Sequence, residues 1–356
     1  MFEVNKYFLL VTLPVKGWYK LSAACRKPFG RLSIYKQSRY KMTFLATPAQ
    51  DKSLLAPLPG VAQVWGCTII RGLRYIIALY IHADKDRHHH SNGRSAMNHS
   101  RELAEALLAA REAGKLQLSF VDKLPVVERK ADASPVTAVD RACETLIRNR
   151  LLKAFPTDGF LGEETPAVAG VGGRRWIVDP LDGTRPYLRG ILTHSVLIAL
   201  EEEGETVIGI IHLPAMNLTC WATRGNGAFL NGKAIRVSSV RTLDAATGVA
   251  LGFREKADSK EGKALLALMR AWDYAYGFMD AYSYVCVASG KLDIAVNLLD
   301  KPWDCASSAC IVTEAGGVFT DISGKQSIHN GSILLSNGYL HEEALRYFSW
   351  KELPEA

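Results

Sequence analysis

The sequence of 356 residues predicts a layered α/β (α+β) fold over residues 97–356. Two segments at the start of this stretch carry apolar residues at helical spacing. Short strands follow them, and helices and strands then alternate to the end. This order predicts sheets covered by helices in layers. Apolar residues make up 48% of the chain and charged residues 22%, so a core of normal size is expected without disulfides.

Two amphipathic helices are predicted first. In residues 100–115, Ser100 can cap the helix and Gly114 suits its end. A second helix fits Thr137 to Phe155, where apolar residues again recur on one face. Later helices are predicted over 260–269, 280–289 and 304–315, and from Glu342 onward.

The predicted strands are short runs of β-branched or aromatic residues bounded by turn residues. They are the segments 174–180, 194–200, 206–214, 218–224, 317–320 and 333–336. Asn226-Gly227 and Asn231-Gly232 predict two tight turns on either side of a three-residue strand. The chain shows no internal repeat.

Residues 1–96 differ from the rest in charge. They contain 15 Lys and Arg against 4 Asp and Glu, which leaves 28 and 32 for residues 97–356. A nucleic-acid function inferred from the pI of about 9.0 would therefore rest on this first segment alone, and no nucleic-acid partner is predicted.

We expect residues 1–96 to be a poorly structured N-terminal extension and residues 97–356 to be the functional domain. Three explanations of the extension stay open. It is a transit segment rich in basic residues, a separate domain, or upstream sequence read as protein because the start was misassigned. The last is favoured, since Met97 stands just before the first regular helix.

Cysteines and apolar runs bear on the compartment. The seven cysteines are scattered without a Cys-x-x-Cys pair, which predicts free thiols in a cytoplasmic protein. Residues 61–82 are the most apolar stretch, but Arg71 and Arg74 interrupt them. No transmembrane helix and no membrane partner are therefore predicted.

The segment Asp179–Thr184, with the sequence DPLDGT, carries the strongest chemical signal. It follows an apolar run that reads as a buried strand, and Pro180 is expected to end the strand at Asp179 because proline cannot donate to the ladder. Asp182 follows three residues later, and Gly183 then makes a tight turn with free amides. Two carboxylates beside exposed amides suit a hard cation and phosphate oxygens.

Other acidic elements are weak alone. Glu163 and Glu164 follow a short apolar strand. Two adjacent glutamates are most simply explained as part of a solvated loop. Asp304 follows Pro-Trp and is placed to cap a helix. Thr137 and Asp140 have the spacing of a helix start. The prediction rests on the combination of these elements.

That combination resembles the inositol monophosphatase superfamily over about residues 100–350. The segments that carry the resemblance are 130–140 (KADASPVTAVD), 162–164 (GEE), 179–184 (DPLDGT), 225–233 (GNGAFLNGK), 302–304 (PWD) and 314–317 (EAGG). The resemblance implies an αβαβα sandwich and a Mg²⁺-dependent phosphatase that acts on a small phosphate monoester. It also implies sensitivity to lithium and a homodimer.

The resemblance further implies roles for single residues. Two or three Mg²⁺ ions would be held by the carboxylates of Glu163, Asp179, Asp182 and Asp304 and by the carbonyl of Leu181. The catalytic residues would be Asp140, Thr184 and Glu163, with Thr184 and Asp140 orienting and deprotonating the water that attacks phosphorus. The amides of Gly183 and Thr184 would hold phosphate oxygens, and Lys130 would lie in a mobile loop.

Residues 130–142 (KADASPVTAVDRA), 184–190 (TRPYLRG) and 280–284 (DAYSY) resemble the corresponding segments of the histidinol-phosphate phosphatases, which act in histidine biosynthesis. Within the superfamily the sequence looks most like this group. The residues expected to bind substrate are Gly183, Thr184, Arg185, Arg189, Asp280 and Asn297. Asp280 would pair with the cationic substrate. Position 297 is Asn where inositol phosphatases usually have Glu, which counts against inositol. Two departures are Pro186 and the missing acid at 297.

Three functions are carried forward. The first is histidinol-phosphate phosphatase. The second is another monoester phosphatase, for inositol 1-phosphate or a 3′(2′),5′-bisphosphate nucleotide. The third is a binding protein of the same fold without activity, which the complete set of acids disfavours.

Overall fold

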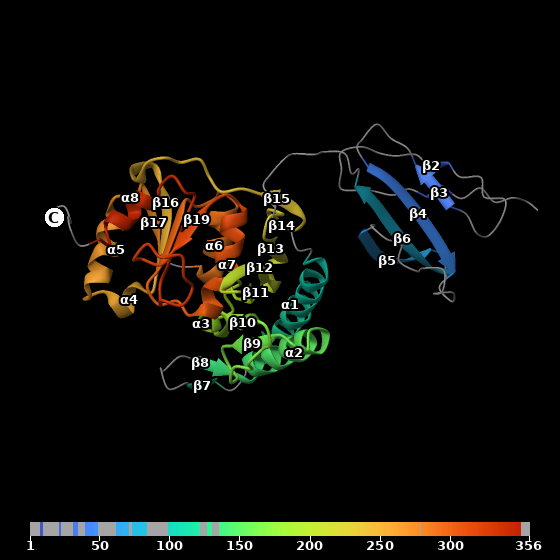
Figure 1. Cartoon of the computed structure of the whole chain (residues 1–356), viewed down its shortest axis with the longest axis horizontal. Helices are drawn as coiled ribbons and strands as arrows, with labels where there is room; N and C mark the ends of the chain where they lie inside the picture. Colours follow the sequence, from blue (N-terminus) through green and yellow to red (C-terminus); the bar gives the residue numbers. More distant parts are fainter. Residues whose placement is uncertain are drawn as a thin grey trace, which may run out of the picture. The chain divides into compact units, whose positions relative to one another are not determined.

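The structure is a computed structural model that describes residues 99–121, 127–129, 135–277 and 279–349, together with six strands before residue 84. It divides into two compact units, Met1–Arg94 and Ser95–Ala356 (Figure 1). Lys130 lies outside the described residues.

The first unit contains two antiparallel sheets. One pairs β1 (Phe8–Leu9) with β2 (Leu21–Ser22). The other has the order β3-β4-β6-β5 and consists of β3 (Arg31–Ile34), β4 (Tyr40–Pro48), β6 (Leu73–Ala83) and β5 (Ala62–Ile70). The apolar run at 61–82 thus falls mainly in two paired strands. Among the described residues, no helix has the length and apolar character needed to cross a bilayer.

A seven-stranded sheet with the order β15-β14-β13-β12-β11-β10-β9 forms the first large layer of the second unit. Its strands are β9 (Gly159–Gly162), β10 (Arg174–Asp182), β11 (Ser195–Glu202), β12 (Glu205–Leu213), β13 (Leu218–Thr223), β14 (Ala228–Leu230) and β15 (Lys233–Ile235). β9 is parallel to β10, and the other pairs are antiparallel. The four strands predicted between 174 and 224 are therefore confirmed.

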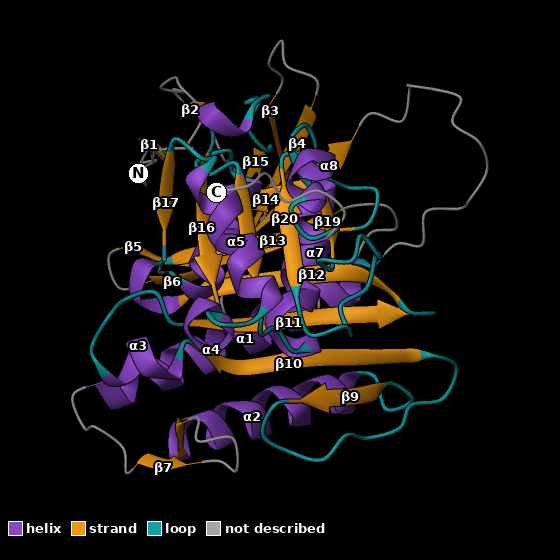
Figure 2. Cartoon of the chain, turned by 90° about the vertical axis from the view of Figure 1, so that its left-hand side faces the viewer, coloured by secondary structure: helices purple, strands orange, loops and turns teal. Residues whose placement is uncertain are grey.

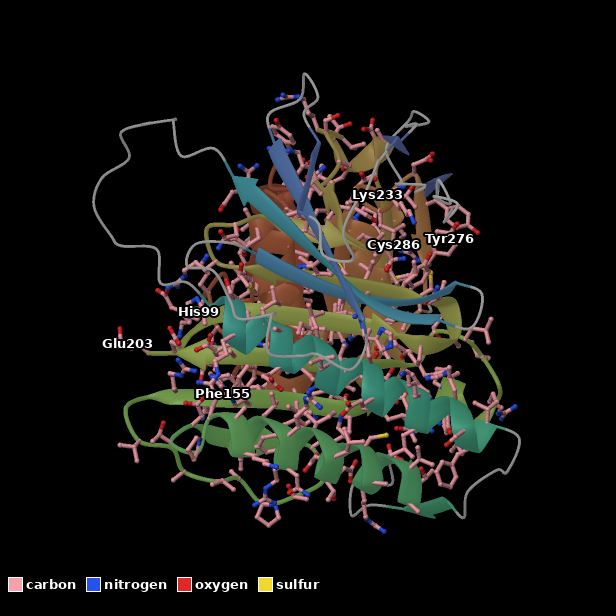
Figure 3. The ribbon with its side chains drawn as sticks, turned by 90° about the vertical axis from the view of Figure 1, so that its right-hand side faces the viewer. His99, Phe155, Glu203, Lys233, Tyr276 and Cys286 are labelled. Carbon is pink, nitrogen blue, oxygen red and sulfur yellow. The ribbon has the colours of Figure 1, made fainter. Side chains whose placement is uncertain are left out.

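Two helices, α1 (Ser100–Phe120) and α2 (Ala138–Ala154), cover one face of this sheet. Figure 3 shows them side by side along the strands, and Figure 2 shows α2 next to β9. α2 has the predicted bounds, with Thr137 as its N-cap. The predicted end of α1 at Gly114 is wrong, because the helix continues through this glycine to Phe120. A Cβ at Gly114 would lie 2.7 Å from the ring of His212, so the glycine is needed for close packing.

The start of α1 and the end of α2 lie together and are fixed by polar contacts. His99, which is the N-cap of α1 in place of the expected Ser100, contacts Glu202 at 3.1 Å. Arg101 donates to the carbonyl oxygen of Ala154 at 3.0 Å. Figure 3 shows the labelled His99 and Phe155 at this end, so the start of α2 lies at the opposite end.

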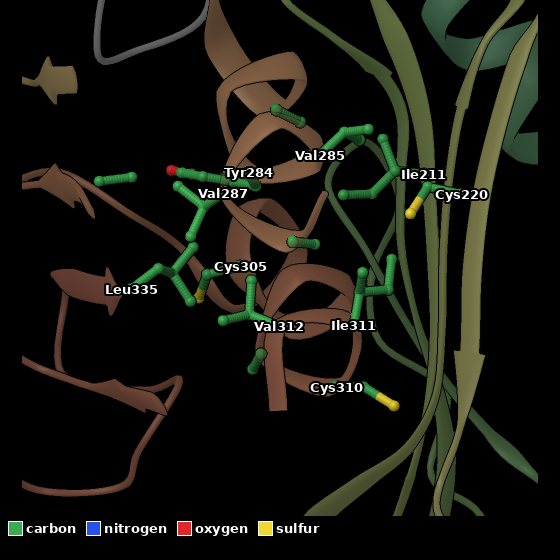
Figure 4. Close-up of a cluster of buried hydrophobic side chains, with 14 of the residues drawn as sticks. Ile211, Cys220, Tyr284, Val285, Val287, Cys305, Cys310, Ile311, Val312 and Leu335 are labelled. Carbon is green, nitrogen blue, oxygen red and sulfur yellow. The ribbon is translucent and has the colours of Figure 1, made fainter. Parts of the chain in front are cut away.

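The second face of the sheet packs on α6 (Asp280–Ala288) and α7 (Pro302–Glu314). Figure 4 shows Ile211 of the sheet pointing toward Val285 and Ile311 of these helices. Five buried cysteines in the described residues are free thiols, as predicted: Cys143, Cys220, Cys286, Cys305 and Cys310.

α7 is held at its last turn as well as at its first. Glu314 accepts hydrogen bonds from the amides of Gly225 and Gly227, both at 2.8 Å. These amides belong to the predicted turn before β14. The contact ties the C-terminal end of α7 to the seven-stranded sheet.

A five-stranded sheet with the order β17-β16-β18-β20-β19 lies on the far side of α6 and α7. Its strands are β16 (Thr247–Leu251), β17 (Tyr274–Tyr276), β18 (Ile294–Asn297), β19 (Val318–Thr320) and β20 (Ile333–Ser336). The outer helices are α4 (Phe253–Lys256), α5 (Lys260–Arg270) and α8 (His341–Arg346), with 3₁₀ turns at Pro214–Met216 and Leu243–Ala245.

The layers of the second unit follow one another as helices, sheet, helices, sheet and helices (Figure 1). The predicted αβαβα sandwich is therefore confirmed. The strands β16, β17 and β18 had not been predicted.

Candidate functional site

The expected strand end at Asp179 is wrong, and the difference shapes the site. β10 continues through Pro180 to Asp182. Asp179 pairs with Leu197 of β11, and Asp182 pairs with Ser195. Between these two pairs β10 advances by three residues and β11 by two, so β10 contains one extra residue. The extra residue is a β-bulge, which bends a strand and redirects side chains. Both aspartates thus lie in one distorted strand end.

The chain turns sharply after this bulge. Gly183 has φ 76° and ψ 44°, a left-handed conformation that glycine adopts without steric cost. Thr184 then begins a short helix, α3 (Thr184–Leu188), which the sequence analysis had described only as a turn. The side chain of Asp179 accepts a hydrogen bond from the amide of Leu181 at 2.9 Å, which fixes it within the turn.

Asp140 and Thr184 come together at the start of α2. The Oδ2 atom of Asp140 accepts from the amide of Thr137 at 2.8 Å and from its hydroxyl at 2.5 Å. The Thr184 hydroxyl is 3.3 Å from Oδ1 of Asp140 and 3.2 Å from the carbonyl oxygen of Leu181. Because a hydroxyl has one proton, it can donate to only one of these oxygens at a time.

Asp140 is almost fully buried. Burial raises the pKa of its carboxyl, and the charge of Glu163 raises it further, while the hydrogen bonds from Thr137 act in the opposite direction. Glu163 follows directly after β9, beside the end of the parallel strand β10. The structure therefore brings the three predicted catalytic residues into one region.

The predicted metal ligands share this region. Burial raises the pKa of Asp179 well above its ordinary value, and three neighbouring charges add to the rise: Glu163, Asp182 and Asp304. Burial also raises the pKa of Asp182, as do the charges of Asp280 and Asp304. These shifts have two causes, of which burial is the larger and the repulsion between neighbouring negative charges is the second. Across the described residues, no three acidic, His or Cys side chains are close enough to enclose a metal ion by themselves.

Asp304 reaches the site from the middle helical layer. It is not the N-cap that the sequence predicts, because α7 begins at Pro302 with Lys301 as its N-cap. Asp304 is the third residue of the helix and accepts a hydrogen bond from the amide of Lys301 at 2.7 Å. A proline suits the first helical position because its missing N–H is not needed there.

Asp280 approaches from α6. Met279 and Asp280 have φ of 113° and 43°, a left-handed backbone that is rare and strained outside glycine. The Oδ2 atom of Asp280 lies 3.4 Å from the place where a Cβ on Gly183 would stand. This atom is buried without a hydrogen-bond partner among the described residues. Burial raises the pKa of the carboxyl, while a side-chain hydrogen bond with Thr193 acts in the opposite direction.

Asp182 connects the two sides of the site. Its Oδ2 atom accepts from the Ser195 hydroxyl at 2.9 Å and from the amide of Ala281 at 3.2 Å. The first donor belongs to β11 and the second to α6. The carboxylate therefore joins the sheet to the helix that carries Asp280.

Asn297 is engaged inside the protein, with a residue that the sequence analysis missed. Its amide nitrogen donates to Asp300 and, at 3.3 Å, to the hydroxyl of Tyr284. The same hydroxyl donates to Asp300 at 3.2 Å. Burial raises the pKa of Asp300 well above its ordinary value, as do the charges of Asp304 and Asp182. Asp300 could have been found from the sequence, because it stands directly before the segment Lys-Pro-Trp-Asp.

Gln117 is a second residue that the sequence analysis missed. Its buried amide nitrogen donates to the carbonyl oxygen of Pro180 in the bulge at 2.8 Å. Its side-chain oxygen is 2.8 Å from Nδ1 of His194, whose pKa burial lowers to about 4. The hydroxyl of Tyr187 donates to the backbone oxygen of Gln117 at 2.8 Å. Gln117 could have been found from the sequence, because it is a polar residue on the face of α1 that otherwise carries alanines and a glycine.

Arg185 and Arg189 lie on α3 and at its C-cap, and both are exposed to solvent. Gly183 and Thr184 begin the same turn. The predicted substrate residues thus come from three places: α3, the start of α6, and the end of β18.

Comparisons with known proteins agree with this architecture. Residues 99–352 match the sequence model of the inositol monophosphatase family. The chain belongs to this family, as the sequence analysis predicts, and is a phosphoric monoester hydrolase.

Three similar proteins illustrate the relationship. A histidinol-phosphatase from Chlorobaculum parvum is 41% identical over 239 residues, which are 66% of this chain and 91% of that protein. A fructose-1,6-bisphosphatase/inositol-1-monophosphatase from Thermotoga maritima is 33% identical over 245 residues, again 66% and 91%. The extragenic suppressor protein suhB from Bartonella henselae has a similar structure, with a TM-score of 0.67, 31% identity and coverage of 71% of this chain and 100% of that one.

Proposed function

We propose that this chain is a Mg²⁺-dependent phosphomonoesterase whose substrate is histidinol phosphate. The observation that carries the proposal is the gathering of buried acids whose charges raise one another's pKa, around Asp179 and Asp182. Buried charges of one sign are unfavourable unless a counter-charge joins them. A cation and its bound substrate would supply that counter-charge.

The donor atoms at the site fit Mg²⁺. All are oxygens, which this hard cation prefers, and Mg²⁺ keeps several waters and shares its shell with substrate phosphate. A close cage of protein ligands is therefore not needed. Two or three ions would be held by Glu163, Asp179, Asp182 and Asp304 and by the carbonyl of Leu181. When bound, they would neutralise the phosphate, activate water and stabilise the leaving oxygen.

Asp140 and Thr184 are suited to proton transfer from the attacking water. Thr137 holds one oxygen of Asp140, which leaves the other facing the Thr184 hydroxyl. The hydroxyl would accept the water's hydrogen bond and pass its own proton toward Asp140, while Glu163 helps to orient the water. A raised pKa makes a carboxylate a better proton acceptor near neutral pH.

Phosphate oxygens would be held by the amides of Gly183 and Thr184 at the turn after the bulge. Arg185 and Arg189 are exposed on the same short helix, where an arriving dianion would meet them. Guanidinium groups bind phosphate well because their N–H groups form a planar fork.

The substrate assignment rests mainly on Asp280. The buried Oδ2 atom of Asp280, which has no hydrogen-bond partner within the described part of the chain, lies beside Gly183 and is suited to a cationic group on the substrate, such as the amino group of histidinol. Asn297 already binds Asp300, so it is poorly placed for the ring hydroxyls of inositol. The histidinol-phosphatase relative is 41% identical, against 33% for the bisphosphatase/inositol phosphatase.

A substrate panel tests this assignment. Phosphate release is measured with histidinol phosphate, inositol 1-phosphate and 3′-phosphoadenosine 5′-phosphate at equal Mg²⁺. We expect the highest kcat/KM for histidinol phosphate. A higher value for either other compound would refute the substrate, and no release from any of them would favour a binding protein.

A further inference from the structure

Glu144 is a fully buried carboxylate one helical turn after Asp140 on α2. Its Oε2 atom accepts from the amide of Glu164 at 2.7 Å, and its Oε1 atom accepts from the hydroxyl of Thr165 at 2.5 Å. Both oxygens therefore bind the loop that follows β9. This loop begins with Glu163.

Glu144 also packs directly on the backbone before Glu163. A Cβ added at Gly162 would lie 2.5 Å from the carboxyl carbon and from both oxygens of Glu144. Real Cβ atoms do not approach other atoms so closely, so a side chain at this position would displace the carboxylate. The glycine in the Gly-Glu-Glu segment therefore leaves the space that the Glu144 carboxylate occupies.

The loop is thus held on two sides of Glu163. On one side Gly162 rests against the carboxylate, and on the other the Glu164 amide donates to it. Buried carboxylates are costly unless their oxygens are hydrogen-bonded, and charge-assisted bonds of this kind are short and strong. The arrangement leaves little freedom for the backbone that carries Glu163.

We propose that Glu144 is a positioning residue that fixes the backbone of Glu163, so that the Glu163 carboxylate is aimed at Asp179 and Asp140 before a metal ion arrives. The metal part of this inference rests on the proposed function. Partners behind metal ligands typically change metal affinity by about 10- to 100-fold when they are removed. Glu144 would act in this way without touching the ion.

Two substitutions test the contact from opposite sides. Glu144→Ala removes the carboxylate, and Gly162→Ala pushes it away. Each should weaken Mg²⁺ binding, measured by calorimetry on the full chain without substrate, by roughly tenfold or more. Glu112→Gln is the matched control, because Glu112 lies at the α1–α2 surface and binds only Arg150 among the described contacts. It should bind Mg²⁺ as the wild type does.

Double variants show whether the two positions act through one contact. In the Glu144→Ala background, Gly162→Ala meets no carboxylate, so it should weaken Mg²⁺ binding little further. In the Glu144→Gln background the amide fills the same space, so Gly162→Ala should keep its full effect. Glu144→Gln alone should lose less affinity than Glu144→Ala, since its oxygen can still accept from the Glu164 amide.

Two results would overturn the inference. One is a Glu144→Ala variant that melts at a lower temperature yet binds Mg²⁺ like the wild type, which would leave Glu144 a role in folding only. The other is an equal effect of Gly162→Ala in all three backgrounds.

Hydrogen exchange keeps this test separate from the proposed function. If the wild type binds no Mg²⁺ and releases no phosphate with it, the proposed function fails. The positioning of the loop is then decided by exchange at the Glu164 amide. That amide should lose protection in Glu144→Ala and keep it in Glu112→Gln, and unchanged protection in Glu144→Ala would defeat the inference.

Discussion

Two groups of acids reach the site from different layers, and their surroundings differ. Asp140, Asp179 and Asp182 come from α2 and the seven-stranded sheet, and each accepts hydrogen bonds from neighbouring donors. Asp280 comes from α6 on a left-handed backbone, with a buried oxygen that lacks a partner among the described residues. The first group is preorganised, whereas the second keeps a bonding position open. We therefore expect the first group, together with Asp304 of α7, to serve the chemistry and Asp280 to select the substrate.

Removing the metal should have the largest effect, because it affects both groups together. We expect phosphate release to stop in excess chelator and to return with Mg²⁺. Li⁺ should inhibit, and so should Ca²⁺, which tolerates irregular ligand shells and would not hold the reacting geometry. Steady-state rates at fixed substrate measure this. Full activity in excess chelator would contradict the metal mechanism.

Neutralising one acid of the sheet comes next. Asp179→Asn or Asp182→Asn should lower kcat about a thousandfold, which corresponds to ~4 kcal/mol of transition-state stabilisation. Asp304→Asn, from the middle layer, should do the same. Melting temperatures provide the control, since the fold should survive. A variant within tenfold of the wild-type rate would remove that residue from the proposed ligands.

Changing the α6 acid should affect binding of one substrate more than turnover. Asp280→Asn should raise KM for histidinol phosphate by roughly tenfold, since a charge-assisted bond is worth about 1.5–3 kcal/mol. The KM for glycerol phosphate, which lacks a cationic group, should change little. Equal changes for both compounds would mean that Asp280 serves only the backbone of α6.

The smallest expected effect concerns Asp300 and pH. Its pKa is raised in the folded chain, so its ionised form destabilises the fold. Without metal, its contribution should be favourable below the unfolded pKa and lost as pH rises through the folded value. Asp300→Asn should therefore melt about 2–4 °C higher than the wild type at pH 8, a gain of ~1 kcal/mol.

This difference in melting temperature should shrink as the pH falls toward about 4, where both chains are neutral at position 300. Thermal scans in chelator across pH measure it. A constant difference at all pH values would show that packing, not charge, separates the two proteins.

Local signals explain why the first group could be predicted. Asp179 and Asp182 follow a strongly apolar strand, and Asp140 stands three residues after a capping Thr, so short segments were sufficient. The bulge escaped prediction because it depends on pairing with β11, which no local pattern records. The predicted helix end at Gly114 was wrong for the same reason, because the glycine packs against His212, which is distant in sequence.

The residues that the sequence did not reveal depend more on tertiary packing. β16 and β18 are short parallel partners that are distant in sequence, and Asn297 ends β18 three residues before Asp300, to which it donates. Glu144 read as an ordinary polar position on α2, although it is fully buried. Buried polar residues on helices are recognised only when the surface that covers them is known.

The helix α7 is held at both ends by hydrogen bonds to carboxylates. In the first turn of the helix, Asp304 accepts a hydrogen bond from the amide of Lys301. At the last residue, Glu314 accepts from two amides of the turn before β14. Ten residues separate these acids, a span of about 15 Å at the ordinary rise of a helix. A negative side chain is unfavourable at the C-terminal end of a helix, so the two amides offset a local cost there. We therefore expect the alignment of Asp304 to depend on the turn at Gly225–Gly227, where a substitution would change it without altering any residue of the proposed site.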